Sequence, residues 1–502
     1  MISKAVRKML ALSLTAVMAV GAMAGCGAKD EQGADPTKAP DNTGDKTQAT
    51  STPVPDAGKD QPEATPTPEP TPEEYVLRTD ANGNVYDLGG MEIIIRDWWA
   101  TGERTRNNAY DEARWDYIEW AEDTYNFTIK EQAIGDWGSN PNDFVDYATT
   151  GGDENYIFTL RQCGTVVSAM NSGLMYDLST LDCLDFSEEK WSSNVHLLMQ
   201  KGSAYYGMRG TDPEPRGCLY FNKKLLEEAG INPNDLYTWQ ENGEWTWAKF
   251  EEVCEKVQRD INSDGETDIY AMVQQGAEFH KQAVFANGGS FIDKDASGKF
   301  FNDLESAETI EALNWTIRMR NTYEMPQPEG SEWNYFYAEF KNGKAAFLTG
   351  QVYNAGQELK DMSDDFGCVV FPQGPSADHY IGFYEDNVYC IPACYDEDKA
   401  WKIAFAYDLY TQPITGFEDA DTWKAGYYQN FRDLESVDYT LARLVSGGSL
   451  MHHLMVAGID LGNDILYNIG TANNEEGQVY TPAQKAEELR EAWNAYINDA
   501  NK

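Results

Sequence analysis

Residues 218–231 read CLYFNKKLLEEAGI, and this stretch decides the fold. The apolar run up to Phe221 predicts a buried strand, and Leu225 and Leu226 then give an apolar face to a short helix. Gly230 is placed to end that helix, because glycine adopts the left-handed conformation of a helix C-cap without strain. A second amphipathic helix is expected over residues 239–259. A strand that passes directly into helices is the repeating unit of an α/β protein.

The rest of the chain continues this alternation of short apolar runs and helical patterns. Strands are expected at residues 91–95, 126–130 and 156–160, and helices at residues 108–125, 166–173 and 481–497. Asn342-Gly343 predicts a tight turn before another buried strand. Because strands and helices alternate, we expect a mostly parallel α/β sheet.

The N-terminus has the pattern of an export signal. Basic residues precede an apolar run over residues 9–22, which is too short for a membrane span. The run is followed by Ala24-Gly25-Cys26, an order that resembles the lipobox of bacterial lipoproteins. That resemblance implies that residues 1–25 are a signal peptide and that Cys26 is acylated, for example with palmitate. An ordinary signal peptide followed by a chance cysteine is the alternative.

A long polar segment and an acidic composition follow the signal. Residues 26–75 are rich in Pro, Thr and Asp, so we expect a disordered spacer after the lipidated cysteine. The chain of 502 residues is long enough for two lobes of ordinary domain size. Its formal net charge of −44 argues against nucleic acid and against an anionic membrane surface as partners, since both require basic patches.

The sequence gives no sign of an active site. Seven cysteines remain besides Cys26, and they lack the CxxC or Cys/His spacing of zinc sites. A single bridge between Cys163 and Cys183 is left open. The five histidines have no metal spacing, and neither a G-x-S-x-G elbow nor a glycine-rich phosphate loop is present. We therefore expect a protein that is not an enzyme.

Ordered blocks over residues 90–430 resemble the extracellular solute-binding proteins (family 1 type) of bacterial ABC sugar importers. The most specific block is residues 218–231, and the others in the second half are residues 244–250, 287–293, 340–350 and 371–375. The resemblance implies an α/β, two-lobed, periplasmic-binding-protein-like fold (type II). In such a fold, crossing strands form a hinge and the ligand lies in a cleft between the lobes.

The resemblance also implies how the chain divides. The first lobe is expected to comprise residues 88–205 and 386–428, and the second residues 206–385 and 429–502. Crossings are expected near residues 206–208, 382–389 and 425–431.

Aromatic residues with polar neighbours at expected strand ends indicate a carbohydrate ligand. Flat rings stack on the C–H faces of sugars, while hydroxyl groups need polar partners. The candidate ligand-binding residues are Asp97, Trp98, Trp99, Trp137, Arg161, Phe221, Gln351, Tyr353, Tyr384, Glu385 and Trp423. Because side chains alternate along a strand, only one of Trp98 and Trp99 is expected to face the cleft. The alternative is that these aromatic side chains fill the core.

One acidic loop has the spacing of a calcium site. Its candidate ligands are Asp260, Asn262, Asp264, Glu266 and Asp268, with Gly265 at the sharp turn of an EF-hand-like loop. Position twelve is Ala271, where an EF-hand has a bidentate Glu. Structural Ca²⁺ and an ordinary acidic surface turn are both compatible with this pattern.

These observations together predict a lipid-anchored, monomeric binding protein on the extracellular face of the cell membrane. It would capture a carbohydrate, an oligosaccharide in particular, and deliver it to the permease subunits of an ABC importer. A binding protein for a peptide or another polar solute is the first alternative, and a lipid-anchored glycoside hydrolase is the second.

Overall fold

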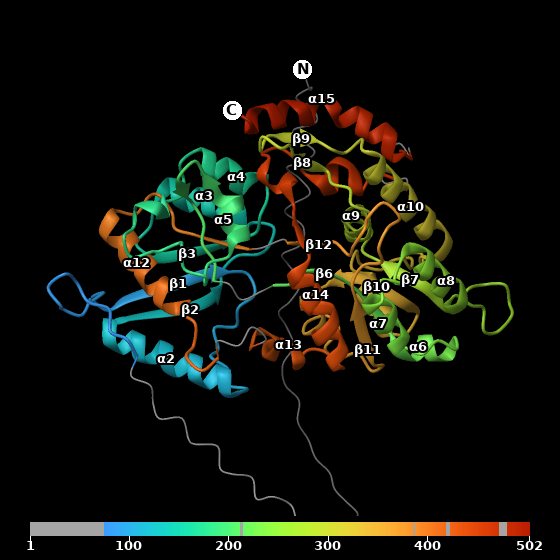
Figure 1. Cartoon of the computed structure of the whole chain (residues 1–502), viewed down its shortest axis with the longest axis horizontal. Coiled ribbons are helices and arrows are strands. Elements are labelled where there is room, and N and C mark those ends of the chain that lie inside the picture. The colour runs from blue at the N-terminus through green and yellow to red at the C-terminus, as the bar shows by residue number, and fades with distance from the viewer. Residues whose placement is uncertain (1–74, 211–213, 385–386, 418–421, 471–478) are drawn as a thin grey trace, which may run out of the picture. The chain divides into compact units, whose positions relative to one another are not determined.

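The computed structural model describes residues 75–502, except residues 211–213, 385–386, 418–421 and 471–478 (Figure 1). The expected signal peptide, Cys26, the spacer up to residue 74 and Glu385 lie outside the described residues. Within the described part of the chain, no helix is long and apolar enough to cross a membrane. The seven cysteines found there are all free, so the bridge left open between Cys163 and Cys183 is not formed.

The first lobe is built on a four-stranded sheet with the order β13-β3-β1-β2. Its strands are β1 (Met91–Asp97), β2 (Phe127–Ala133), β3 (Asn155–Leu160) and β13 (Val388–Cys390). Strand β1 pairs in parallel with β2 and β3, and β13 is antiparallel to β3. The mostly parallel sheet expected for this part of the chain is therefore confirmed.

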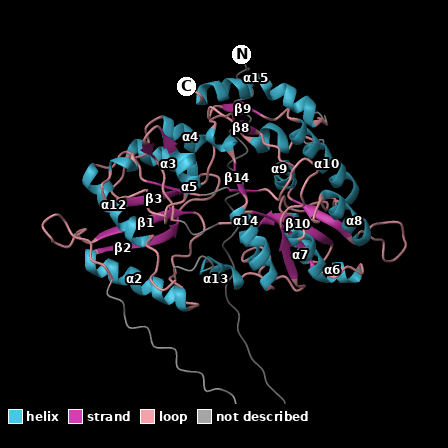
Figure 2. Cartoon of the chain, viewed as in Figure 1, coloured by secondary structure: helices cyan, strands magenta, loops and turns pink. Residues whose placement is uncertain are grey.

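Helices cover both faces of this sheet, and Figure 2 shows its strands lying between them. One face packs on α2 (Ala109–Tyr125) and α12 (Glu397–Tyr410), and the other on α3 (Asn140–Thr150) and α4 (Gly164–Asn171). Consecutive residues of β3 serve the two faces, since Ile157 belongs to the first core and Phe158 to the second. From Ile157 to Leu160 the strand is fully buried, because both of its faces are covered.

The second lobe contains a mixed four-stranded sheet with the order β11-β6-β10-β7. Its strands are β6 (Gly217–Asn222), β7 (Tyr270–Gln274), β10 (Ala345–Gln351) and β11 (Phe366–Val369). Strand β10 is parallel to β7, but both β10 and β11 are antiparallel to β6. All its strands are buried in one large apolar core, which also receives helices from the C-terminal part of the chain.

The stretch at residues 218–231 forms the strand and helix expected of it. Strand β6 ends at Asn222, whose side chain accepts a hydrogen bond from the Leu225 N–H and so caps α6 (Lys223–Glu228). Leu225 and Leu226 are buried, and Gly230 has a φ of +76°, as a C-cap glycine requires. The second expected helix is divided into α7 (Asn234–Glu241) and α8 (Trp247–Val257).

The remaining elements complete both lobes and the segments between them. In the first lobe they are η1 (Leu178–Thr180), α5 (Ser193–Met199), β4 (Gln200–Lys201) and β5 (Ala204–Tyr205). Further along lie α9 (Gly276–Ala286), β8 (Ile292–Lys294), β9 (Phe300–Asn302), α10 (Ala307–Tyr323), α11 (Tyr335–Lys341), η2 (Val352–Ala355), β12 (Gly382–Tyr384), η3 (Thr422–Lys424) and α13 (Ala425–Tyr428). The C-terminal part contains η4 (Ser436–Leu441), α14 (Ala442–Ser446), β14 (Gly448–Leu450), η5 (His452–Met455), η6 (Gly462–Leu466) and α15 (Pro482–Ala500), of which η4 and η6 are π-helical.

Two contacts lie where the chain was expected to cross between lobes. Met208 forms a bridge with Tyr389 of β13, and β12 pairs with β14. Trp423 was assigned to the first lobe but packs against the core of the second. The exact lobe boundaries otherwise stay a prediction.

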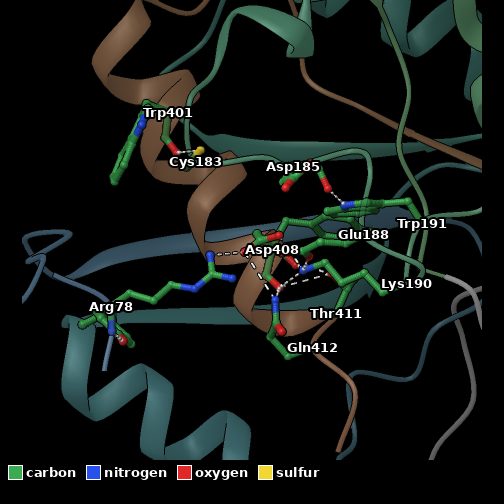
Figure 3. A network of polar contacts seen from close by, with 12 residues as sticks. Arg78, Cys183, Asp185, Glu188, Lys190, Trp191, Trp401, Asp408, Thr411 and Gln412 are labelled. Atoms are coloured by element: carbon green, nitrogen blue, oxygen red, sulfur yellow. Dashed lines mark hydrogen bonds and ion pairs between the residues drawn. The ribbon is translucent and has the colours of Figure 1, made fainter. Parts of the chain in front are cut away.

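Asp408 on α12 ties distant segments of the first lobe together (Figure 3). Its buried carboxylate forms ion pairs with Arg78 and with buried Lys190, whose Nζ lies 2.5 Å from Oδ1. The Lys190 Nζ also donates to the Asp408 carbonyl oxygen at 3.0 Å. Arg78 belongs to the first segment that the structure describes, and its backbone N–H donates to the Tyr125 hydroxyl at 2.7 Å. Two positive charges thus share the Asp408 carboxylate, and the Glu188 carboxylate lies a further 3.4 Å from the Lys190 Nζ.

We expect Asp408→Ala to lower the free energy of unfolding by about 3–5 kcal/mol, because the buried Lys190 charge would keep only the more distant and exposed Glu188 carboxylate. Urea and thermal unfolding followed by circular dichroism measure this change. Asp398→Ala is the matched control, since Asp398 lies on the same helix but is exposed and forms an ion pair with Lys402. The control should cost no more than about 0.5 kcal/mol. Equal stability of the two variants would show that the buried network is dispensable.

Candidate ligand-binding cleft

A cleft of about 1640 Å³ is lined by residues from both lobes. Small-molecule sites usually measure about 300–1000 Å³, so this cleft has room for a larger ligand or for ordered water beside a small one. Its lining combines tryptophan and tyrosine side chains with arginine, glutamate, glutamine and asparagine. Six residues of the set expected from the sequence line it: Trp98, Trp99, Trp137, Arg161, Gln351 and Tyr353.

Trp98 and Trp99 both line the cleft, so the expectation that only one would face it is wrong. Strand β1 ends at Asp97, and the alternation of side chains along a strand does not apply to the bend that follows. The two rings meet edge to face, with centroids 4.7 Å apart and an interplanar angle of 80°. Trp99 is 42% exposed and offers part of its ring to a ligand.

Asp97 is buried and holds this bend instead of lining the cleft. Its Oδ1 accepts hydrogen bonds from the backbone N–H groups of Trp99 at 3.0 Å and Ala100 at 2.9 Å. Its Oδ2 is buried without a hydrogen-bond partner among the described residues. Burial raises the pKa of the Asp97 carboxyl, although the two amide hydrogen bonds oppose this shift. The structure thus makes Asp97 a positioning residue for the tryptophan pair.

Trp137 and Arg161 form a second unit of the first lobe. Arg161 follows β3 directly, and its Nε donates a hydrogen bond to the Trp137 carbonyl oxygen at 2.8 Å. The guanidinium carbon lies 4.0 Å from the centroid of the Trp137 ring, which is the distance of a cation–π contact. Trp137 is nevertheless 60% exposed. The ring therefore supports the arginine and still presents open surface to the cleft.

Gln351 and Tyr353 belong to the end of β10 and the turn η2 that follows it. The Gln351 side chain accepts a hydrogen bond from Arg216 at 3.2 Å, and the Arg216 carbonyl oxygen accepts one from Val352 at 2.9 Å. The guanidinium of Arg216 also lies 5.8 Å from the Tyr353 ring centroid. These contacts fix an arginine, an amide and a phenol side by side in the second lobe.

The other expected ligand-binding residues do not join this set. Phe221 is fully buried and packs edge to face on Tyr237, because β6 is covered on both faces. Trp423 does not line the cleft, but its ring contacts that of Tyr427, which does. Tyr384 lies in β12, and its side chain, like Glu385, is outside the described part of the structure. For Phe221 and Trp423, the expectation of a place in the cleft is corrected.

The cleft also contains aromatic residues that the sequence did not single out, namely Trp333, Tyr337, Tyr389, Tyr427 and Tyr467. Trp333 is 70% exposed in the polar stretch 329–334, so its surroundings could have identified it. Tyr467 follows the π-helical turn η6 and packs closely on Gly462, where an added Cβ would come within 2.6 Å of its ring. Nothing local to Tyr467 in the sequence indicates such a position.

Ion pairs neutralise several charges of the cleft. Glu214 pairs with both Arg209 and Arg216, the latter at 2.6 Å, and Glu278 pairs with Lys281 at 3.1 Å. Glu131 accepts a hydrogen bond from the Tyr410 hydroxyl at 3.0 Å. Burial raises the pKa of the Glu131 carboxyl, against the lowering effect of nearby Arg114.

The acidic loop at residues 260–268 is folded around its own side chains. Asp260 accepts hydrogen bonds from the N–H groups of Ser263 at 2.6 Å and Gly265 at 2.8 Å, and these amides lower its pKa. Asp268 accepts one from the Ile261 N–H at 2.8 Å. Ala271 is buried in β7 and supplies no side-chain oxygen. Among the described residues, no group of three or more His, Cys, Asp or Glu side chains is arranged to hold a metal ion.

Two α/β lobes therefore contribute to one polar and aromatic cleft. Residues 202–404 match the family model of the bacterial extracellular solute-binding protein. Over 187 residues the chain is 24% identical to the arabinooligosaccharide-binding protein of Halalkalibacterium halodurans. That match spans 36% of this chain and 37% of the relative's length.

Solved structures are similar over most of the chain. The GacH receptor of Streptomyces glaucescens, determined unliganded and with acarbose, matches with a TM-score of 0.56 at 14% identity over 82% of this chain and 99% of that one. UgpB from Mycobacterium tuberculosis, in complex with glycerophosphocholine, matches with a TM-score of 0.57 at 15% identity over 81% and 98%. Similarity at such low identity concerns the fold, and it confirms the expected two-lobed architecture. The match over residues 202–404 confirms the resemblance to extracellular solute-binding proteins.

Proposed function

We propose that this chain captures an oligosaccharide outside the cell and delivers it to the permease of an ABC importer. One observation carries the proposal: aromatic side chains from both lobes, with polar groups between them, line a single cleft. Trp99 and Trp137 from the first lobe and Trp333 and Tyr353 from the second expose ring surface there. Sugar rings offer apolar C–H faces to such rings, and their hydroxyl groups satisfy the neighbouring amides and charges.

The size of the cleft and the ligands of similar proteins support an oligosaccharide as the ligand. Several separate ring surfaces suit a ligand of several sugar residues better than a single monosaccharide, which would leave most of them unused. The relative from Halalkalibacterium halodurans is an arabinooligosaccharide-binding protein, and the structurally similar GacH receptor was solved with acarbose. A lobe that closes over the ligand would then give the permease a recognisable surface.

Another polar solute is the second candidate. UgpB has the same fold and was solved with glycerophosphocholine, so the fold alone does not select sugars. A glycoside hydrolase is the rival of a different class, because it would use similar aromatic platforms. We propose binding without catalysis.

Incubation with a panel of neutral and acidic oligosaccharides tests the function. We expect one ligand to raise the melting temperature and to remain chemically unchanged, since a ligand that binds only the folded state stabilises it. Trp99→Ala should weaken that ligand's binding by about 1–3 kcal/mol in calorimetric titration, through loss of one stacking surface. Trp401→Ala is the control, because Trp401 packs on Phe405 in the first lobe and does not line the cleft. New reducing ends would identify an enzyme, and binding of a phosphodiester or peptide instead would favour the other solutes.

We also infer that Cys26 anchors the protein through lipid, as its lipobox-like surroundings suggest. Cys26→Ala should release the protein from the membrane fraction or leave its signal uncleaved, because a thioether lipid requires the cysteine sulfur. Cell fractionation with N-terminal sequencing measures both outcomes. Cys394→Ala removes an exposed cysteine of the folded part and should change neither. A processed Cys26→Ala protein that stays with the membrane would refute the anchor.

Calcium at the loop 260–268 is likewise a proposal, supported by its oxygen-bearing side chains and by Gly265 at φ +95°. EDTA should lower the melting temperature and added Ca²⁺ should restore it. Asp264→Ala should abolish that response, because it removes a ligand from the middle of the loop. Asp295→Ala, in an exposed turn that Asp295 caps in a similar way, should preserve it. A wild-type protein that ignores EDTA would leave only an acidic turn.

A further inference from the structure

Arg161 is held in place before any ligand arrives. The hydrogen bond from Nε to the Trp137 carbonyl and the contact with the Trp137 ring fix the guanidinium at the end of β3. Only one of the five N–H donors of an arginine is used by that hydrogen bond. The remaining donors form a planar fork that suits a carboxylate, and its orientation costs little entropy on binding because it is already fixed.

Arg161 differs from the other cations of the cleft in its partners. Arg209 and Arg216 share Glu214, and Lys281 pairs with Glu278. Within the part of the chain that the structure describes, no carboxylate forms an ion pair with Arg161. The lack of a paired carboxylate is unusual here, because the chain has 83 acidic residues and only 39 basic ones.

The topology of the first sheet places a second arginine beside Arg161, and it shares the single carboxylate of Glu214 with Arg216. Arg161 follows β3, Asn387 precedes the paired strand β13, and Arg209 follows Met208, which bridges Tyr389 on the other side of β13. All three line the cleft, so the two arginines lie at the same end of neighbouring strands. Their backbones are separated by two strand spacings, about 10 Å. Helix α4 begins at Gly164, which also lines the cleft, and its N-terminus has no side-chain cap. A helix N-terminus carries a partial positive charge, so it also favours an anion here.

We propose that the oligosaccharide carries a carboxylate, as in a uronic acid residue, and that Arg161 binds it. This inference rests on the proposed carbohydrate function and names the ligand class. The open surface of Trp137 would stack on the acidic sugar ring while the Arg161 fork pairs with its carboxylate. A charge-assisted, bidentate pair is stronger than hydrogen bonds to neutral hydroxyl groups. A neutral ligand would instead leave the guanidinium without a counter-charge when water is displaced from the cleft.

Calorimetric titration of the full mature chain with matched ligand pairs tests the inference. The acidic probes are short oligosaccharides of galacturonate, of alginate and of glucuronate-substituted xylose, and each is compared with its carboxyl-reduced, neutral form. We expect at least one acidic probe to bind about tenfold or more tightly than its reduced form. Arg161→Gln should abolish this preference while binding of the reduced form persists, and Arg161→Lys should restore part of it, since lysine keeps the charge but loses the fork.

Arg318→Gln is the control, because Arg318 pairs with Glu251 away from the cleft and should not affect the preference. Thermal melts verify that each variant is folded. Equal or tighter binding of neutral forms, or a preference that survives Arg161→Gln, would overturn the inference and leave the carbohydrate function intact. Failure of every acidic and neutral oligosaccharide to bind would instead overturn the proposed function itself, and this inference with it.

Discussion

Both central sheets are covered by apolar cores, and this constraint decides where polar groups can lie. A side chain in the middle of β3 or β6 packs against a neighbouring element whichever way it points. From such strands, polar and aromatic groups reach the cleft where the strands end. Accordingly, the first lobe contributes to the cleft through the residues that follow β1 and β3, and the second through those that follow β7 and β10. The cleft is thus a direct consequence of two sheets whose interiors are dry.

The same constraint explains the role of a buried carboxylate at the rim. Asp97 ends β1 by accepting two backbone N–H groups of the bend, so the bend keeps its hydrogen bonds where the sheet stops. Its second oxygen, Oδ2, is buried without a hydrogen-bond partner among the described residues, and this lowers the stability of the fold. The resulting geometry turns two adjacent tryptophans toward the cleft. Asp97 thus holds the bend through Oδ1 while Oδ2 makes no hydrogen bond to the described residues.

The sequence predicted well what depends on local pattern. Short β-branched and aromatic runs identified β1, β3, β6 and β10, and the Gly230 cap identified the end of α6. It failed for Phe221, because a strand buried on both faces shows no alternation that would separate core from cleft. It also failed for Trp98 and Trp99, since the end of β1 is fixed by hydrogen bonds of Asp97 and not by the apolar run.

Other parts of the cleft are tertiary features that no local pattern announces. Tyr467 and Arg209 line the same cleft because the C-terminal segment folds back to it. Glu214 pairs with both Arg209 and Arg216 through contacts that the fold sets. Trp333 is the exception, because an exposed tryptophan in a polar stretch is visible in the sequence. Residue types could therefore suggest the ligand class, but only the fold could select the residues.

The attachment of Arg78 to Asp408 also has a mechanical meaning. The chain enters its first lobe through this pair, and Tyr75 adds ring contacts with Tyr117 and Trp120 of α2. Any tension transmitted along the chain from residues before Tyr75 is therefore borne by α2 and α12, which are packed on the same sheet. If the chain is anchored through Cys26, as we propose, a pull on it would reach helices that pack on one sheet and do not line the cleft.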